Sequence, residues 1–103
     1  MSGFVFHPEA ISDLEEIWEF IANDNLDAAD RVLKEIRGTI ELLASYPHTG
    51  HVRADLASPS FLFHPVRGFL IAYAAEEDPT VVLAILHGRR NPRIIGALLR
   101  GRE

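Results

Sequence analysis

The amino-acid sequence predicts an α+β fold in which helices pack on a small, mainly antiparallel sheet. Two segments in the first half repeat apolar residues at helical spacing, whereas three short segments in the second half are apolar runs typical of strands. No repeat, low-complexity segment or linker divides the 103 residues. We therefore expect one domain over residues 1–103, with an N-terminal strand, an antiparallel helical hairpin, three strands and a short C-terminal helix.

The first expected elements are a short strand and an amphipathic helix. Residues 4–6 form a β-like run that ends before Pro8. Pro8 suits the first position of a helix, and Glu9 complements the positive end of the helix dipole. We expect this helix to end near Asn23. Its predicted apolar stripe consists of Ile11, Leu14, Trp18 and Ile21.

A second helix follows after a very short link. Asn25 or Asp24 can cap its N-terminus, and Pro47 ends it. Because the link is short, the two helices are expected to form an antiparallel hairpin. The predicted apolar stripe of the second helix consists of Ala29, Val32, Leu33, Ile36, Ile40 and Leu43.

The second half of the chain changes to the pattern of strands. Residues 61–63 resemble a strand, but Pro65 limits this segment to an edge or irregular strand. Gly68 can turn the chain into a second strand over residues 69–74. After a turn at residues 76–79, residues 80–86 form a nearly continuous, β-branched apolar run. This run predicts a central strand that the hairpin covers on at least one face.

A short helix is expected at the C-terminus. Asn91 and Pro92 form a cap and first-turn signature before the apolar residues of 93–99. A helix of this length is marginal alone, so its apolar side must dock on the rest of the protein.

The composition excludes several classes of protein. The chain has no cysteine, which removes disulfides, thiolate catalysis and cysteine-based metal sites and fits a reducing cytoplasm. The apolar run of residues 81–86 is far shorter than the roughly 20 residues that cross a membrane. The N-terminus lacks the basic and apolar regions of a secretory signal. We expect a cytoplasmic protein without a membrane partner.

Charge is distributed unevenly along the chain. The net charge of −5 argues against a protein that binds nucleic acid over its whole surface. Residues 1–50 carry ten acidic and three basic residues, whereas residues 51–103 carry seven arginines and five acidic residues. This pattern indicates either a solvated acidic helical face with a solubilising basic tail or a basic C-terminal patch that meets an acidic partner. The final residues include Arg89, Arg90, Arg93, Arg100 and Arg102.

Few residues form a pattern that points to catalysis. His48 and His51 have a metal-like spacing but fall in a turn, so we predict neither a metal site nor a cofactor. One constellation remains, in which His87–Asn91 ends the last strand and Arg67 precedes the strand before it. Arginines and a histidine could stabilise phosphate charge and move a proton in a metal-free ribonuclease. Alternatively, His87 only caps the strand and the arginines pair with the acidic hairpin; whether Arg67 lies at the same end stays open.

Five segments together form a more specific pattern: Ala10–Trp18, Leu43–Gly50, Arg53–Leu56, Phe69–Tyr73 and Ile85–Asn91. In this order and at these distances they resemble the RelE/ParE superfamily of type II toxin–antitoxin toxins, and most closely its ParE branch. The resemblance covers about residues 4–91 and implies a RelE/ParE-like fold. It also implies a cognate antitoxin, usually a ParD-like protein with a ribbon-helix-helix part, through which alone the toxin reaches DNA.

The resemblance further implies a cellular target. RelE-like members cut messenger RNA in the ribosome, whereas ParE-like members are associated with poisoning DNA gyrase. No catalytic tyrosine follows Arg90, and an acidic protein fits ribosomal RNA poorly, so we expect a gyrase inhibitor that is not an enzyme. The alternatives are a ribosome-dependent endonuclease that uses Arg67, His87 and Arg89, and an inactive relic that serves as a complex subunit or co-repressor.

We expect two binding surfaces, one for the gyrase target and one for the antitoxin. We expect Arg89, Arg90 and Arg93 to contact the target. The antitoxin is expected on the helical hairpin and the exposed sheet edge, where its tail needs apolar surface on which to fold. Candidate additions from the terminal segment are Ile94, Ile95, Leu98 and Leu99, unless these residues lie in the core.

Overall fold

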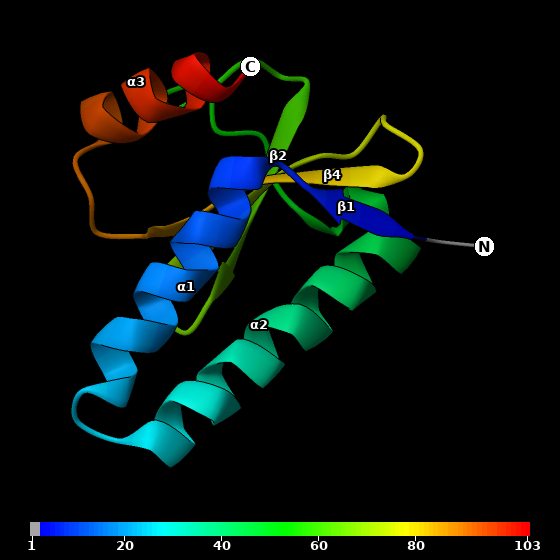
Figure 1. Cartoon of the computed structure of the whole chain (residues 1–103). Helices are drawn as coiled ribbons and strands as arrows, with labels where there is room; N and C mark the ends of the chain where they lie inside the picture. Colours follow the sequence, from blue (N-terminus) through cyan, green and yellow to red (C-terminus); the bar gives the residue numbers. More distant parts are fainter. Residues whose placement is uncertain (1–2) are drawn as a thin grey trace.

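The computed structural model describes residues 3–103 and confirms the α+β fold (Figure 1). Its elements are β1 (Phe4–Phe6), α1 (Pro8–Ala22), α2 (Leu26–Ser45), the 3-10 helix η1 (Pro47–Thr49), β2 (Phe61–Val66), β3 (Phe69–Ala74), β4 (Thr80–His87) and α3 (Pro92–Arg102). Figure 1 shows α1 and α2 side by side as a hairpin, with α3 set apart from them. The order of the elements is the predicted one.

The strands form one sheet in the order β1-β4-β3-β2. The pairs β2–β3 and β3–β4 are antiparallel, and β1 pairs parallel to β4. The sheet is therefore mainly antiparallel, and β4 occupies an interior position, as its apolar run predicts.

Strand β2 lies at the edge, as Pro65 predicts, but it continues past Pro65 to Val66. The reason is the alternation of hydrogen bonds in an antiparallel sheet. Gly88 N–H donates to the carbonyl of Gly68, so the alternation directs the main-chain groups of Leu70 toward β4. Pro65 stands opposite Leu70, at a position that forms no hydrogen bonds with β3. The missing N–H of Pro65 therefore removes no hydrogen bond between β2 and β3.

The hairpin begins and turns at well-formed caps. Pro8 occupies the first turn of α1, and the Nδ1 atom of His7 accepts a hydrogen bond from Glu9 N–H at 3.1 Å. Asn25, rather than Asp24, caps α2 by accepting from Ala28 N–H at 2.9 Å.

The apolar stripe of α2 is as predicted, but that of α1 is partly wrong. Ile11 is 46% exposed, whereas Ala10 and Ile17 are buried. Ala10, Leu14, Ile17 and Ile21 follow helical spacing along the face that packs into the core. Ile11 lies beside this face and therefore remains at the surface.

The sheet separates two hydrophobic clusters. Ile71 and Tyr73 of β3 pack with the hairpin, whereas the alternate residues Leu70 and Ala72 pack with α3. Helix α3 continues to Arg102 and docks through Ile95 and Leu99, as its marginal length predicts. A Cβ at Gly96 would lie 3.2 Å from the carbonyl oxygen of Leu56, so glycine permits this close approach.

A buried tyrosine ties the end of the hairpin to the sheet. The Tyr73 hydroxyl donates to the carbonyl of Pro47 at 2.6 Å and accepts from Gly50 N–H at 2.9 Å. Burial raises the pKa of Tyr73. A Cβ at Gly50 would stand only 2.4 Å from the hydroxyl oxygen, so this position requires glycine.

Candidate functional site

The three predicted target-binding arginines lie where β4 leads into α3, with Arg89 and Arg90 on the connecting loop and Arg93 in the first turn of α3. Arg89, Arg90 and Arg93 are exposed, and within residues 3–103 none of their side chains forms an ion pair. The main chain of this segment is nevertheless fixed. Arg90 N–H donates to the carbonyl of His87 at 3.2 Å, and the Asn91 side chain accepts from Arg93 N–H at 2.9 Å. The three guanidinium groups are thus presented on an ordered backbone.

The alternative set, Arg67, His87 and Arg89, lies at one end of the sheet. Gly88 N–H donates to the carbonyl of Gly68 at 2.9 Å, which joins the β2–β3 turn to the end of β4. Arg67, at a φ of 48°, forms an ion pair with Glu35 of α2. The His87 ring packs on Phe69, with ring centroids 4.9 Å apart. Arg67 and His87 therefore each have a partner other than the arginine segment.

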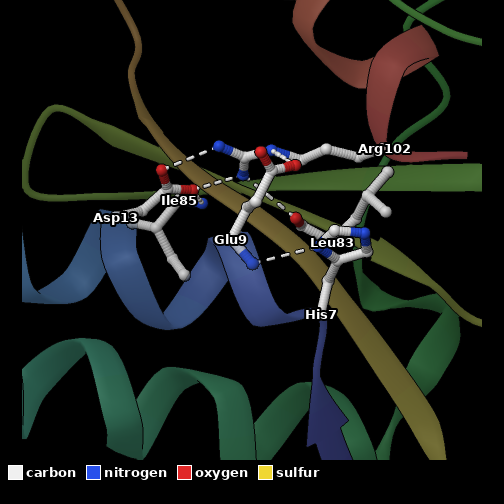
Figure 2. Close-up of polar contacts among 6 residues, drawn as sticks. All are labelled: His7, Glu9, Asp13, Leu83, Ile85 and Arg102. Carbon is white, nitrogen blue, oxygen red and sulfur yellow. Dashed lines mark hydrogen bonds and ion pairs between the residues drawn. The ribbon is translucent and has the colours of Figure 1, made fainter.

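The most buried charged group is Arg102, which the sequence analysis did not select. Its side chain is 8% exposed and that of Asp13 is 11% exposed. Two guanidinium nitrogens donate to the Asp13 carboxylate, at 2.5 and 2.9 Å, and Glu9 lies 3.3 Å away (Figure 2). The hydrogen bonds with Asp13 raise the pKa of Arg102 above its ordinary value.

This ion pair sits on the edge of β4 that β1 leaves uncovered. Strand β1 pairs only with residues 80–82 of β4. Beyond them, the Asp13 carboxylate accepts from Ile85 N–H at 3.0 Å, and Arg102 donates to the carbonyl of Leu83 at 3.2 Å. Figure 2 shows both side chains converging on β4 from α1 and α3. We refer to Asp13 and Arg102 with these two contacts as the Arg102 latch.

A groove of about 480 Å³ follows the same edge. We call it the β4 groove. Helix α1 contributes an acidic wall and the apolar residues Ile17 and Phe20, whereas Arg90 stands near the end of β4. Phe20 is 74% exposed. A groove with apolar walls and opposite charges suits recognition of a peptide, because a few placed charges fix the orientation of an apolar ligand.

A second apolar hollow lies between the two helices of the hairpin, and we call it the hairpin groove. It comprises two adjoining hollows of about 410 and 310 Å³ that share Leu14 and Leu33. Glu15 and Glu19 line the first, and Lys34 and Arg37 line the second. The remaining apolar and aromatic lining residues are Phe6, Ile11, Trp18 and Ile40.

The four apolar residues of the terminal segment divide into two kinds. Ile95 and Leu99 are 2% and 0% exposed and belong to the core of this chain, so they are not available to a partner while α3 is docked. Ile94 is 56% exposed, and Leu98 is half-buried at the β4 groove.

Neither a metal cluster nor a membrane span is found in the part of the chain that the structure describes. No group of three His, Asp or Glu side chains among residues 3–103 is arranged to hold a metal ion. The described helices are also too short or too polar to cross a bilayer.

Together, these features define the class of protein. A strand, a helical hairpin, three strands and a terminal helix around a mixed sheet form a RelE/ParE-like domain. The family model described as the ParE toxin of the type II toxin–antitoxin system, parDE, matches residues 4–92, so the chain belongs to that family. As a member it is a type II toxin with a cognate antitoxin. A comparison with curated proteins gave no match.

Proposed function

We propose that this toxin inhibits DNA gyrase, and thereby replication, and that a ParD-like antitoxin neutralises it. The observation that carries the proposal is the ordered segment on which Arg89, Arg90 and Arg93 are exposed and form no ion pair within residues 3–103. Arginine forms paired hydrogen bonds with carboxylates and phosphates, so this segment suits a protein target that is engaged with DNA. On this proposal the toxin acts by binding and catalyses no reaction.

The ribonuclease alternative has weaker support from the geometry. It requires Arg67, His87 and Arg89 to act on one phosphate. Arg67 is instead paired with Glu35, and His87 packs on Phe69. A substrate would have to break the first contact before Arg67 could serve it.

The antitoxin is proposed to cover the hairpin groove and the exposed sheet edge, together with Ile94 and Leu98. The apolar residues of the hairpin groove supply burial, and the acidic and basic rims supply orientation for an amphipathic segment.

Pulse-labelling tests the target. The toxin is induced without its antitoxin, and thymidine and methionine incorporation are followed in the same culture. We expect thymidine incorporation to fail first. An earlier loss of methionine incorporation would establish the ribonuclease alternative, and unimpaired growth at normal toxin levels would indicate an inactive relic. A purified supercoiling assay then tests gyrase directly.

Charge reversal tests the arginine segment. Replacing Arg89, Arg90 and Arg93 with glutamate should abolish toxicity at unchanged protein levels. The matched control places the same change of net charge elsewhere, through the substitutions Arg31→Glu, Arg53→Glu and Arg100→Glu. Equal toxicity of the two triple variants would show that these arginines do not contact the target.

A further inference from the structure

On the β4 edge beyond β1, two main-chain groups have no hydrogen-bond partner among residues 3–103. The pairs Phe69–His87 and Ile71–Ile85 are the non-hydrogen-bonded pairs of the β3–β4 ladder, because Gly68 and Gly88 form a bonded pair in the same register. The N–H and C=O groups of Ile85 and His87 therefore point away from β3, toward the open edge.

Two of these four groups are already bonded. Asp13 accepts from Ile85 N–H, and Arg90 N–H donates to the His87 carbonyl. Within residues 3–103, no hydrogen bond joins the Ile85 carbonyl or His87 N–H to another group on this side. Ile85 lines the β4 groove and is only 2% exposed, so its carbonyl has little access to bulk water. Such a group favours a partner that donates a hydrogen bond.

Which two groups are free determines whether a partner strand can run parallel or antiparallel to β4. An antiparallel strand bonds to the N–H and C=O of the same residue, but Ile85 and His87 each have one of these groups engaged. A parallel strand instead places one residue opposite Leu86, where it donates to the Ile85 carbonyl and accepts from His87 N–H. Strand β1 pairs with β4 in this parallel manner, so the partner continues the line of β1.

The direction also determines the charge that the partner needs. A parallel segment runs from the Arg102 latch toward His87, so its C-terminal side approaches Arg90 and the neighbouring Arg89. These exposed guanidinium groups suit an acidic side chain or a terminal carboxylate. Leu86 and Leu98 belong to the cluster on the α3 face of the sheet, whereas Ile85 and Ile17 belong to the cluster on the hairpin face. Because side chains alternate along a strand, a residue opposite Leu86 would lie on the side of Leu98, and its neighbours on the side of Ile17 and Phe20.

We propose that a short extended segment of the cognate antitoxin, acidic at its C-terminal side, adds to β4 as a parallel strand opposite Leu86. This inference rests on the proposed antitoxin partnership and specifies where and how one segment binds. The groove volume of about 480 Å³ falls within the roughly 300–1,000 Å³ of pockets that enclose small ligands. The β4 groove and the hairpin groove then bind different parts of one antitoxin.

Residue-resolved hydrogen exchange on the free toxin and on the co-purified toxin–antitoxin complex tests the proposal. The His87 amide should exchange at least tenfold more slowly in the complex. If a complex forms and protects only the hairpin, the strand proposal is overturned while the antitoxin partnership stands. If no complex forms, both fail. Protection of His87 in a dimer of the free toxin would show that a second copy occupies the edge, which also overturns the proposal.

A pair of variants tests the main-chain bond itself. His87→Pro removes the N–H at an edge position where proline is tolerated, and His87→Ala removes the same side chain but keeps the N–H. We expect His87→Pro to bind the antitoxin at least tenfold more weakly than His87→Ala. Unchanged circular dichroism and unchanged β3–β4 amide exchange identify folded variants. Equal affinities of the two folded variants would overturn the proposal.

Discussion

Replacement of Arg102 with methionine should detach α3 from the body of the toxin. The change keeps a long apolar side chain but removes the charge that pairs with Asp13 and Glu9. The Asp13 carboxylate, with its side chain 11% exposed, would keep only its bond from Ile85 N–H. Loss of one partner from a buried ion pair typically costs about 3–5 kcal/mol.

The position of Arg102 sets a limit on this cost. Arg102 lies in the last turn of α3, so the helix can undock and let water reach Asp13. The loss is therefore bounded by the docking energy of α3, to which burial of Ile95 and Leu99 contributes about 1.5–3 kcal/mol each before ordering costs. We expect the free energy of unfolding to fall by about 3 kcal/mol, a large part of the roughly 5–15 kcal/mol of an ordinary domain.

Urea unfolding followed by circular dichroism measures this loss, and native-state hydrogen exchange locates it. Amides of α3 should exchange faster in Arg102→Met, whereas the exchange rates of β3 amides should stay unchanged. Arg100→Met is the matched control, because Arg100 is exposed and should change stability by no more than about 0.5 kcal/mol. Adding Asp13→Leu to Arg102→Met should recover part of the loss, since no unpaired carboxylate then remains. Equal stability of Arg102→Met and Arg100→Met would refute the reasoning.

Three further predictions concern the fold and the antitoxin surface. Gly50→Ala should lower the unfolding free energy by about 1–3 kcal/mol because its Cβ meets the Tyr73 hydroxyl, whereas Gly38→Ala, with open space inside α2, should raise it by about 0.5–1 kcal/mol in the same urea experiment. Because burial raises the pKa of Tyr73, the neutral phenol favours the folded state. This contribution is complete below the ordinary pKa of about 10 and is lost as pH rises through the raised value; a Tyr73→Phe variant should lack that part of the alkaline loss. Ile11→Asp in the hairpin groove should weaken antitoxin binding in calorimetry without altering the fold. The similarly exposed Leu26→Asp, outside the groove, should not, and equal affinities would argue against the groove as an antitoxin site.

The sequence predicts the elements well because their signals are local. Caps at Asn25 and Asn91, the break at Pro47 and the β-branched run of β4 each act within a few residues. The core face of α1 is not determined by local sequence, because apolar residues also occur on both sides of that face. Both Ile11 and Ile17 fit a helical period, and only the packing against α2 and the sheet decides between them.

Features that depend on contacts distant in the sequence were not predictable in this way. Asp13 and Arg102 are separated by 89 residues, and each is one member of a charged cluster with several similar neighbours. Nothing local distinguishes Arg102, which is buried, from Arg100, which is exposed. The alternative in which the arginines near His87 pair with the acidic hairpin holds for Arg67, whereas Arg89 and Arg90 form no ion pair within residues 3–103. Arg102, which was not part of that alternative, pairs with Asp13 and Glu9 of the hairpin.

The Arg102 latch also explains why the open part of β4 is so short. An uncovered strand edge invites pairing with any other chain, and proteins commonly protect such edges with charged side chains. Here Asp13 and Arg102 occupy the Ile85 N–H and Leu83 carbonyl, the groups that follow directly after the last residue paired with β1. In the part of the chain that the structure describes, only the Ile85 carbonyl and the His87 N–H then remain without a partner on this edge. One ion pair therefore both docks the terminal helix and restricts the accessible edge to a length that a single short segment can cover.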